Sequence, residues 1–184
     1  MKLALLAISM LAATAAMAQY NPIELAKDSH PTSSLKPPTI GCLYSFGGSV
    51  SRSGPTLSDS MLQGKVTLIS FWFRRCRPCV AELDALNRLY QNLKGSSAFQ
   101  LISICPDTPE ALANTIKEYA VAYTSLTANA CRRLNSGMGY PTTIIVDRRG
   151  RVTYVNSGGK VEPMQVEKDI LQLENRIRAL LENQ

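Results

Sequence analysis

Two cysteines separated by two residues are the most chemically active feature of this sequence. Cys76 and Cys79 lie between a run of β-branched and aromatic residues and a helical stretch that Pro78 opens. At a helix N-terminus the unpaired backbone N–H groups and the helix dipole favour an anion, and Arg77 adds positive charge. These effects lower the pKa of a thiol from about 8.5. The pattern predicts thiol–disulfide chemistry, with Cys76 near the N-cap as the attacking thiolate and Cys79 as the resolving thiol.

The same pair would also fit a permanent disulfide or half of a metal site. A zinc site usually needs a second pair of ligands at matching spacing, and the sequence contains none. The only histidine, His30, lies in a stretch rich in proline and serine. This scarcity counts against zinc sites of the Cys/His kind and against a catalytic dyad that uses histidine. We therefore expect neither a metal nor a cofactor.

Three further cysteines bring the total to an odd number, so at least one is a thiol or pairs with another molecule. Cys105 ends a predicted strand and Cys131 begins a predicted helical turn. A structural disulfide between these two is one interpretation, and two buried thiols that act as small hydrophobic residues are the other. A second redox pair that passes electrons to Cys76 and Cys79 is a third. Cys42 has no obvious partner.

Hydrophobic periodicity predicts the elements that must position the pair. Residues 66–73 form a continuous apolar run, which is typical of a strand buried on both faces. The helix that follows, up to about Leu93, has one apolar face. The alternation of strands and helices predicts an α/β sheet with helices on both faces. The other expected elements are a strand and turn at 40–50, strands at 99–105, 123–127, 142–146 and 151–155, and helices at 57–62, 110–119, 128–134 and 166–181.

The start of the chain is predicted to be an export signal. Lys2 supplies a positive charge, residues 3–16 are apolar, and residues 16–18 (Ala-Met-Ala) match a small-x-small cleavage site. The alternative, an uncleaved anchor, would need about 20 apolar residues. We expect a signal peptide at 1–18, a proline-containing linker at 19–38 and one domain at 39–184, with no stable membrane insertion after cleavage.

The formal net charge of +6 is mild and spread along the chain. Its tightest basic group, Arg74, Arg75 and Arg77, lies beside the cysteine pair, where it would stabilise a thiolate. The sequence carries no nucleic-acid-binding motif, so we expect no nucleic-acid partner.

The order of these motifs resembles the thioredoxin-like oxidoreductases of the bacterial cell envelope, the TlpA/ResA type. The resemblance covers roughly residues 38–181 and implies an α/β thioredoxin fold: a central mixed sheet flanked by helices on both faces, with an N-terminal β extension. The family usually has Trp before the first cysteine, whereas this chain has Arg75, which changes the rim of the substrate surface. The matching segments are Gly64-Lys65-Val66, Phe71-Trp72, Cys76-x-x-Cys79-x-x-Glu82, Gly139-Tyr140-Pro141-Thr142-Thr143 and Val146-Asp147.

The resemblance also implies roles for individual residues. Pro141 matches a cis-proline that faces the cysteine pair, so Tyr140 would border the substrate groove. Glu82 matches an acidic residue behind the site, where burial would raise its pKa and let it exchange protons with the thiols; the alternative is a solvated helix residue. Trp72 matches an aromatic residue near the site, or packs in the core. With Arg77, the residues Pro141, Tyr140 and Trp72 form the expected substrate-binding set.

These features predict a thiol–disulfide oxidoreductase that acts on protein thiols and disulfides in the periplasm, or otherwise outside the cytoplasm. The family resemblance favours a reductase with a membrane-bound electron donor, although a stabilised thiolate would make the disulfide more oxidising. One alternative is a thiol peroxidase, whose site resembles Thr-x-x-Cys with an assisting Arg; here Phe73 takes the Thr position. Others are a copper chaperone, which resembles Cys-x-x-x-Cys with a distant His, and a binding module with an inert disulfide.

Overall fold

The computed structural model describes residues 36–48, 51 and 56–183. The predicted signal peptide at 1–18 and nearly all of the predicted linker at 19–38, including His30, lie outside these residues. Within the described ranges, no helix combines the length and hydrophobicity needed to cross a bilayer.

A mixed sheet of five strands, in the order β3-β2-β1-β4-β5, forms the centre of the fold. β1 runs parallel to β2, and β2 to β3, whereas β4 is antiparallel to both β1 and β5. All six residues of β1 are buried, which confirms the prediction of a strand covered on both faces. The strands are β1 (Val66–Phe71), β2 (Phe99–Cys105), β3 (Thr124–Thr127), β4 (Thr142–Val146) and β5 (Val152–Ser157).

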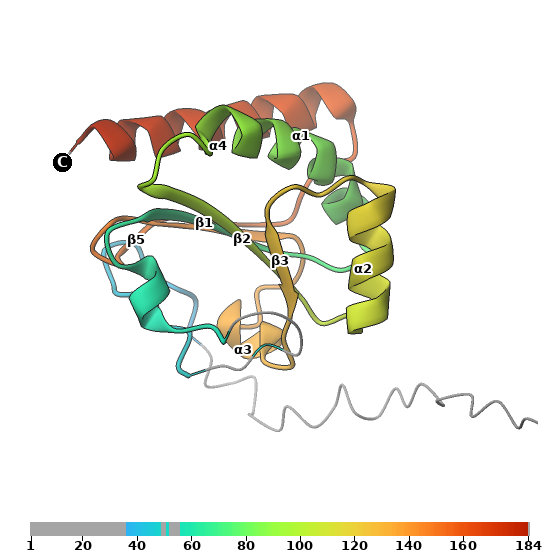
Figure 1. The fold of residues 1–184 in the computed structure, drawn as a ribbon, viewed down its shortest axis with the longest axis horizontal. Coiled ribbons are helices and arrows are strands. Elements are labelled where there is room, and N and C mark those ends of the chain that lie inside the picture. The colour runs from blue at the N-terminus through green and yellow to red at the C-terminus, as the bar shows by residue number, and fades with distance from the viewer. Residues whose placement is uncertain (1–35, 49–50, 52–55, 184) are drawn as a thin grey trace, which may run out of the picture.

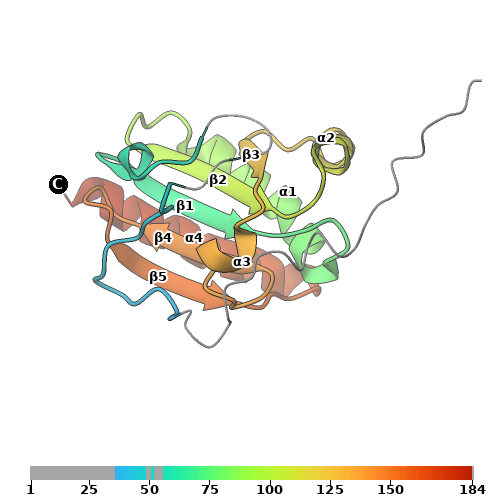
Figure 2. The ribbon, with the colours of Figure 1, turned by 90° about the horizontal axis from the view of Figure 1, so that it is seen from below.

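Helices cover both faces of this sheet, as the α/β prediction required (Figure 1). Seen from below in Figure 2, the short α3 lies in front of the sheet, and α1 and α4 lie behind it. α2 stands beside β3 at the edge. The predicted helix at 57–62 is a 3₁₀ turn, η3. The helices are η3 (Asp59–Leu62), α1 (Arg77–Leu93), α2 (Pro109–Glu118), α3 (Cys131–Leu134) and α4 (Pro163–Glu182).

The apolar face predicted for α1 is confirmed by its buried side chains, which pack between the sheet and α4. Leu83, Leu86, Leu89 and Leu93 recur every three or four residues and are all buried. Burial of each leucine stabilises the fold by roughly 1.5–3 kcal/mol. This packing fixes the axis of α1 and therefore the position of its N-terminus, where the cysteine pair lies.

The predicted N-terminal β extension is shorter than a regular strand. Leu43 forms an antiparallel bridge with Arg151, the backbone N–H groups of Gly41 and Tyr44 donate to the carbonyls of Val152 and Gly150, and the predicted turn at 47–48 follows. Gly41 has φ +90°, a left-handed conformation that interrupts an extended strand. Side chains also hold the segment, because Tyr44 and Phe46 bury their rings in the core in an edge-to-face contact. Short antiparallel backbone pairing and buried rings therefore attach this segment together.

Candidate active site

Cys76 and Cys79 are joined by a disulfide at the N-terminus of α1, with Cα atoms 5.2 Å apart. Cys76 is the N-cap residue, and its sulfur accepts a hydrogen bond from the backbone N–H of Cys79 at 3.3 Å. This confirms the predicted N-cap position. Cys76 is 6% exposed and Cys79 only 1%, so the first cysteine is the more accessible of the two.

The chain reaches this disulfide directly from the central strand. After β1, the N–H of Trp72 still donates to the carbonyl of Ile104, and the N–H of Cys76 donates to the carbonyl of Phe73 to close a turn. The first helical hydrogen bond runs from the N–H of Val80 to the carbonyl of Cys76. Pro78 sits in the first turn, where its missing N–H costs little. The unpaired N–H groups of this turn favour negative charge on the Cys76 sulfur.

A small apolar cluster supports the disulfide from inside. Trp72 is 2% exposed and packs in this cluster with both cysteines, Cys105 and Leu112. Trp72 therefore lies beneath the disulfide as a packing residue, and its indole does not reach the surface that a substrate would contact.

The loop before β4 lies against the same cluster. The Tyr140–Pro141 peptide bond is cis, as the family resemblance implied. The half-buried Tyr140 ring meets the ring of Phe73 edge-on, with centroids 5.2 Å apart, and packs against the disulfide cluster. The N–H of Gly158 donates to the carbonyl of Pro141 at 2.8 Å and ties the next loop to it. The proline loop and the disulfide are thus brought together.

Glu82 lies one turn beyond Cys79 on α1 and is partly buried. The backbone of Gly159 lies between the Glu82 carboxylate and the Pro141 ring. A Cβ atom at this position would be only 2.5 Å from Glu82 Oε1 and 2.7 Å from Pro141 Cγ, so a larger residue would not fit there. Burial, and secondly the charge of Asp169, raises the pKa of Glu82 to about 7. This direction agrees with the predicted rise in pKa, and the partly buried Glu82 is not a fully solvated helix residue.

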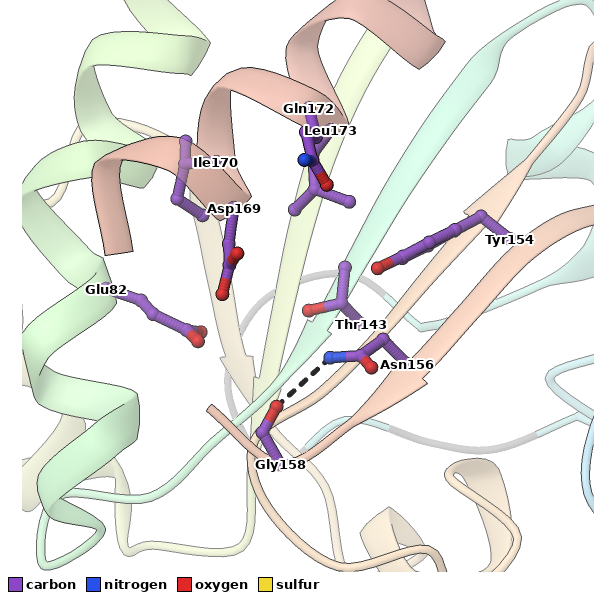
Figure 3. A pocket seen from close by; sticks show the side chains of 9 residues that line it. All are labelled: Glu82, Thr143, Tyr154, Asn156, Gly158, Asp169, Ile170, Gln172 and Leu173. Carbon is purple, nitrogen blue, oxygen red and sulfur yellow. Dashed lines mark hydrogen bonds between the residues drawn. The ribbon is translucent and has the colours of Figure 1, made fainter. Parts of the chain in front are cut away.

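Glu82 faces a polar pocket of about 130 Å³ between α1, α4 and the ends of β4 and β5 (Figure 3). The carboxylates of Glu82 and Asp169 point towards the same space from opposite helices. The Asn156 amide donates to the carbonyl of Gly158 at 3.0 Å at its mouth. Such a pocket offers a water-accessible route to a carboxylate that lies next to the cysteine pair in sequence.

Comparison with known proteins agrees with this geometry. The profile of the AhpC/TSA family matches residues 48–155, more than half of the chain. The chain belongs to the AhpC/TSA family. Within it, the protein is a TlpA/ResA-like redoxin: the thiol-disulfide oxidoreductase ResA of Halalkalibacterium halodurans is 27% identical over 117 residues, which cover 60% of this chain and 64% of that protein. ResA of Bacillus cereus is 28% identical over 94 residues, which cover 50% and 54%. The aligned part thus spans less than two thirds of these relatives.

Solved structures show the same thioredoxin-like fold. The protein of Chlorobium tepidum assigned as thiol:disulfide interchange protein DsbE has a TM-score of 0.66 at 22% identity, over 78% of this chain and 99% of that one. A thiol:disulfide interchange protein from Bacteroides sp. has a TM-score of 0.58 at 20% identity, over 78% and 91%.

The arginines of this redoxin differ in their surroundings. The backbone N–H of Arg74 donates to Asp107 at 2.7 Å, and its guanidinium pairs with Glu118 at 3.1 Å. Both side chains of that pair are about half exposed, so it stabilises the fold by no more than about 1 kcal/mol. Arg75 and Arg77 are exposed and have no acidic partner among the described residues. The redoxin therefore carries two uncompensated positive charges beside Cys76.

The other cysteines are thiols in the structure. Cys105 and Cys131 are both buried and are not joined by a disulfide. The structure therefore contains two buried thiols here and no structural disulfide between them. Burial, and then the charge of Asp107, raises the pKa of Cys105 to about 12. The Tyr140 hydroxyl interacts with both thiols, and burial, followed by these neighbours, raises its pKa. Cys42 is exposed.

Sequence reasoning missed two residues at this redoxin's site, Gly159 and Asp169. Gly159 follows Gly158 directly after β5, and this glycine pair was a signal of close backbone approach. Asp169 precedes the buried Ile170 on α4, but nothing in its local pattern separates it from an ordinary surface acid. Only the packing of α4 against α1 brings it to Glu82.

Proposed function

We propose that this redoxin exchanges disulfides with protein substrates through Cys76 and Cys79. The observation that carries the proposal is a disulfide at a helix N-cap beside a cis-proline loop. In the reductive direction, the Cys76 thiolate attacks a substrate disulfide, forms a mixed disulfide and releases one substrate thiolate. The Cys79 thiolate then attacks the Cys76 sulfur, closes the redoxin disulfide and releases the second substrate thiolate. Two electrons pass from the redoxin to the substrate.

Glu82 is proposed as the group that takes the proton from Cys79. Cys79 is almost fully buried, so solvent cannot easily remove its proton, and it must be a thiolate to attack. A carboxyl whose pKa lies near 7 is half ionised at neutral pH, which suits both acceptance and release of a proton.

The substrate surface is proposed to consist of the proline loop and the arginine rim. Tyr140, which precedes Pro141, packs against the disulfide cluster, and the exposed Arg75 and Arg77 are the sequence neighbours of Cys76. Their charge favours substrates with acidic residues near the reacting disulfide, mainly through faster encounter. Trp72 would act from beneath by holding the disulfide in place.

The reductive direction, a membrane-bound electron donor and export to the periplasm belong to the same proposal. The likeness to the ResA oxidoreductases and the predicted export signal support them. Equilibration of the Cys76–Cys79 pair with glutathione tests the direction: a potential well above about −180 mV would argue for an oxidant.

Trapping is the direct test of the proposed exchange. A Cys79→Ala variant should retain substrates as mixed disulfides on Cys76, visible as adducts that dithiothreitol releases. The Cys76→Ser/Cys79→Ala double variant is the matched control and should retain none. Exchange activity that survives Cys76→Ser would contradict the assignment, and peroxide consumption that survives Cys79→Ser would favour a thiol peroxidase instead.

A further inference from the structure

The polar pocket behind the disulfide contains an acid that the exchange reaction described above does not use. Asp169, on α4, and Glu82, on α1, line the same pocket, and their carboxylates point towards one another across it (Figure 3). We propose that Asp169 is a positioning residue for disulfide exchange, and that the pocket it shares with Glu82 is the path by which the Cys79 proton reaches water. The inference rests on the proposed function and extends it.

The Glu82 carboxylate faces the pocket on one side. On the other side, Gly159 and the Pro141 ring approach its carboxylate so closely that no further atom would fit between them. The pocket volume of about 130 Å³ is well above the roughly 15 Å³ that one buried water needs. Its rim includes the exposed Asn156 and Gln172, so water in the pocket is continuous with solvent. A proton leaving Glu82 therefore has this route out.

Asp169 is held in place by its own helix. The side-chain amide of Gln165, one turn earlier on α4, donates to Asp169 Oδ1 at 2.7 Å. Ile170 and Leu173 of the same helix are buried against the sheet, which fixes the rotation of α4 and keeps Asp169 at the pocket. An acid fixed in this way exerts a constant field on its neighbour.

Within the part of the chain that the structure describes, no cation is among the causes that shift the pKa of Glu82. Tyr154, on β5, lines the pocket, and its ring is covered by the Arg176 guanidinium at 5.0 Å from the centroid. Tyr123 lies just before β3, and burial, followed by the charge of Glu82, raises the pKa of its hydroxyl. The loop and β4 contribute Gly159, Pro141 and Thr143, which carry no charge. Burial and the charge of Asp169 are the two causes that raise the pKa of Glu82.

The proton balance of the resolving step follows from this arrangement. The Glu82 carboxylate takes the Cys79 proton, the Cys79 sulfur bonds to the Cys76 sulfur, and the substrate sulfur leaves with the electron pair of the broken bond. Glu82 then passes its proton to water in the pocket. Because the negative charge of Asp169 stabilises the protonated form of Glu82, it sets the pH at which Glu82 can accept the proton.

The test is the pH profile of the resolving step, measured by stopped flow with full-length protein and a model disulfide. Asp169→Asn removes the charge and keeps the shape, so Glu82 should ionise at lower pH. The acidic limb should move down by roughly 0.5–1 pH unit, which makes the variant about three- to fivefold faster than wild type near pH 6. Asp169→Glu should restore the wild-type profile. The matched control is Asp84→Asn, an acid on α1 outside this pocket, which should leave the profile unchanged.

Two outcomes would overturn the inference. One is an Asp169→Asn profile that superimposes on the wild-type profile. The other is a shift that persists in a Glu82→Gln background, since the charge would then act elsewhere. Loss of exchange in Cys76→Ser, together with an unshifted Asp169→Asn profile, would leave the proposed function standing and refute only the role of Asp169. Exchange that survives Cys76→Ser would refute the function itself.

Discussion

The buried carboxyl of Glu82 makes the stability of the oxidised redoxin depend on pH. Its pKa is raised from 4.5 to about 7 in the folded chain. Between these pH values the folded chain binds a proton that the unfolded chain has already lost, so the free energy of unfolding falls as the pH rises. At about 1.4 kcal/mol per pH unit, the loss reaches on the order of 3 kcal/mol by pH 8. The stabilising contribution of protonated Glu82 is complete below pH 4.5 and is gone above pH 7.

Glu82→Gln should abolish this loss, because the amide does not titrate in that range. We expect the variant to be more stable than wild type at pH 8 by on the order of 3 kcal/mol, and to lose this advantage towards pH 5. Urea unfolding of the oxidised protein at pH 5, 6, 7 and 8 measures the difference. The fluorescence of Trp72, the only tryptophan and almost fully buried, provides the signal.

The comparison with wild type isolates one group, since the other carboxyls titrate equally in both proteins. Asp84→Asn, an exposed acid on the same helix, is the control and should follow wild type throughout. If the stability difference between Glu82→Gln and wild type were the same at pH 5 and pH 8, Glu82 would not be a proton-binding site with a raised pKa, and its proposed catalytic role would lose its physical basis.

Other contacts lead to measurable expectations. Gly159→Ala should reduce stability by roughly 1–3 kcal/mol and slow exchange, because the new Cβ would lie 2.5 Å from the Glu82 carboxylate. The control is Gly95→Ala, whose Cβ would meet no atom within 4 Å and which should change neither property. Alkylation of the native oxidised protein, followed by peptide mass spectrometry, should modify Cys42 and leave Cys105 unmodified until unfolding. Arg77→Gln should lower kcat/KM for acidic substrates at low salt and weaken its salt dependence; equal salt slopes would argue against the arginine rim.

The central strands were predictable from sequence for a simple reason. A strand covered on both faces is largely apolar along its length, so residues 66–71 and 99–105 are visible as mostly apolar runs. The cysteine pair was predictable too, since the helix start follows from Pro78 and the periodicity of α1. These features are local, and local chemistry determines them.

The remainder depends on contacts between distant segments. Residues 40–48 contain apolar side chains at strand-like spacing, yet their backbone pairs only briefly with residues 150–152, and burial of the Tyr44 and Phe46 rings adds to the attachment. Asp169 has the pattern of a surface acid, and its relation to Glu82 arises only when two helices pack on one face of the sheet. No local pattern encodes a distance across that packing.

The two chemical tasks of the site are separated by the geometry of one helix. Cys76, at the N-cap of α1, receives the field of the unpaired N–H groups and faces the proline loop. Glu82, two turns on, lies beyond that field and faces α4, where burial and Asp169 favour the protonated form. The sulfur is thus held where an anion is favoured, and the carboxyl where an anion is disfavoured. Because the charge of Asp169 acts on the second environment and not on the packing of α1, removal of that charge should alter proton transfer while leaving the geometry of the disulfide intact.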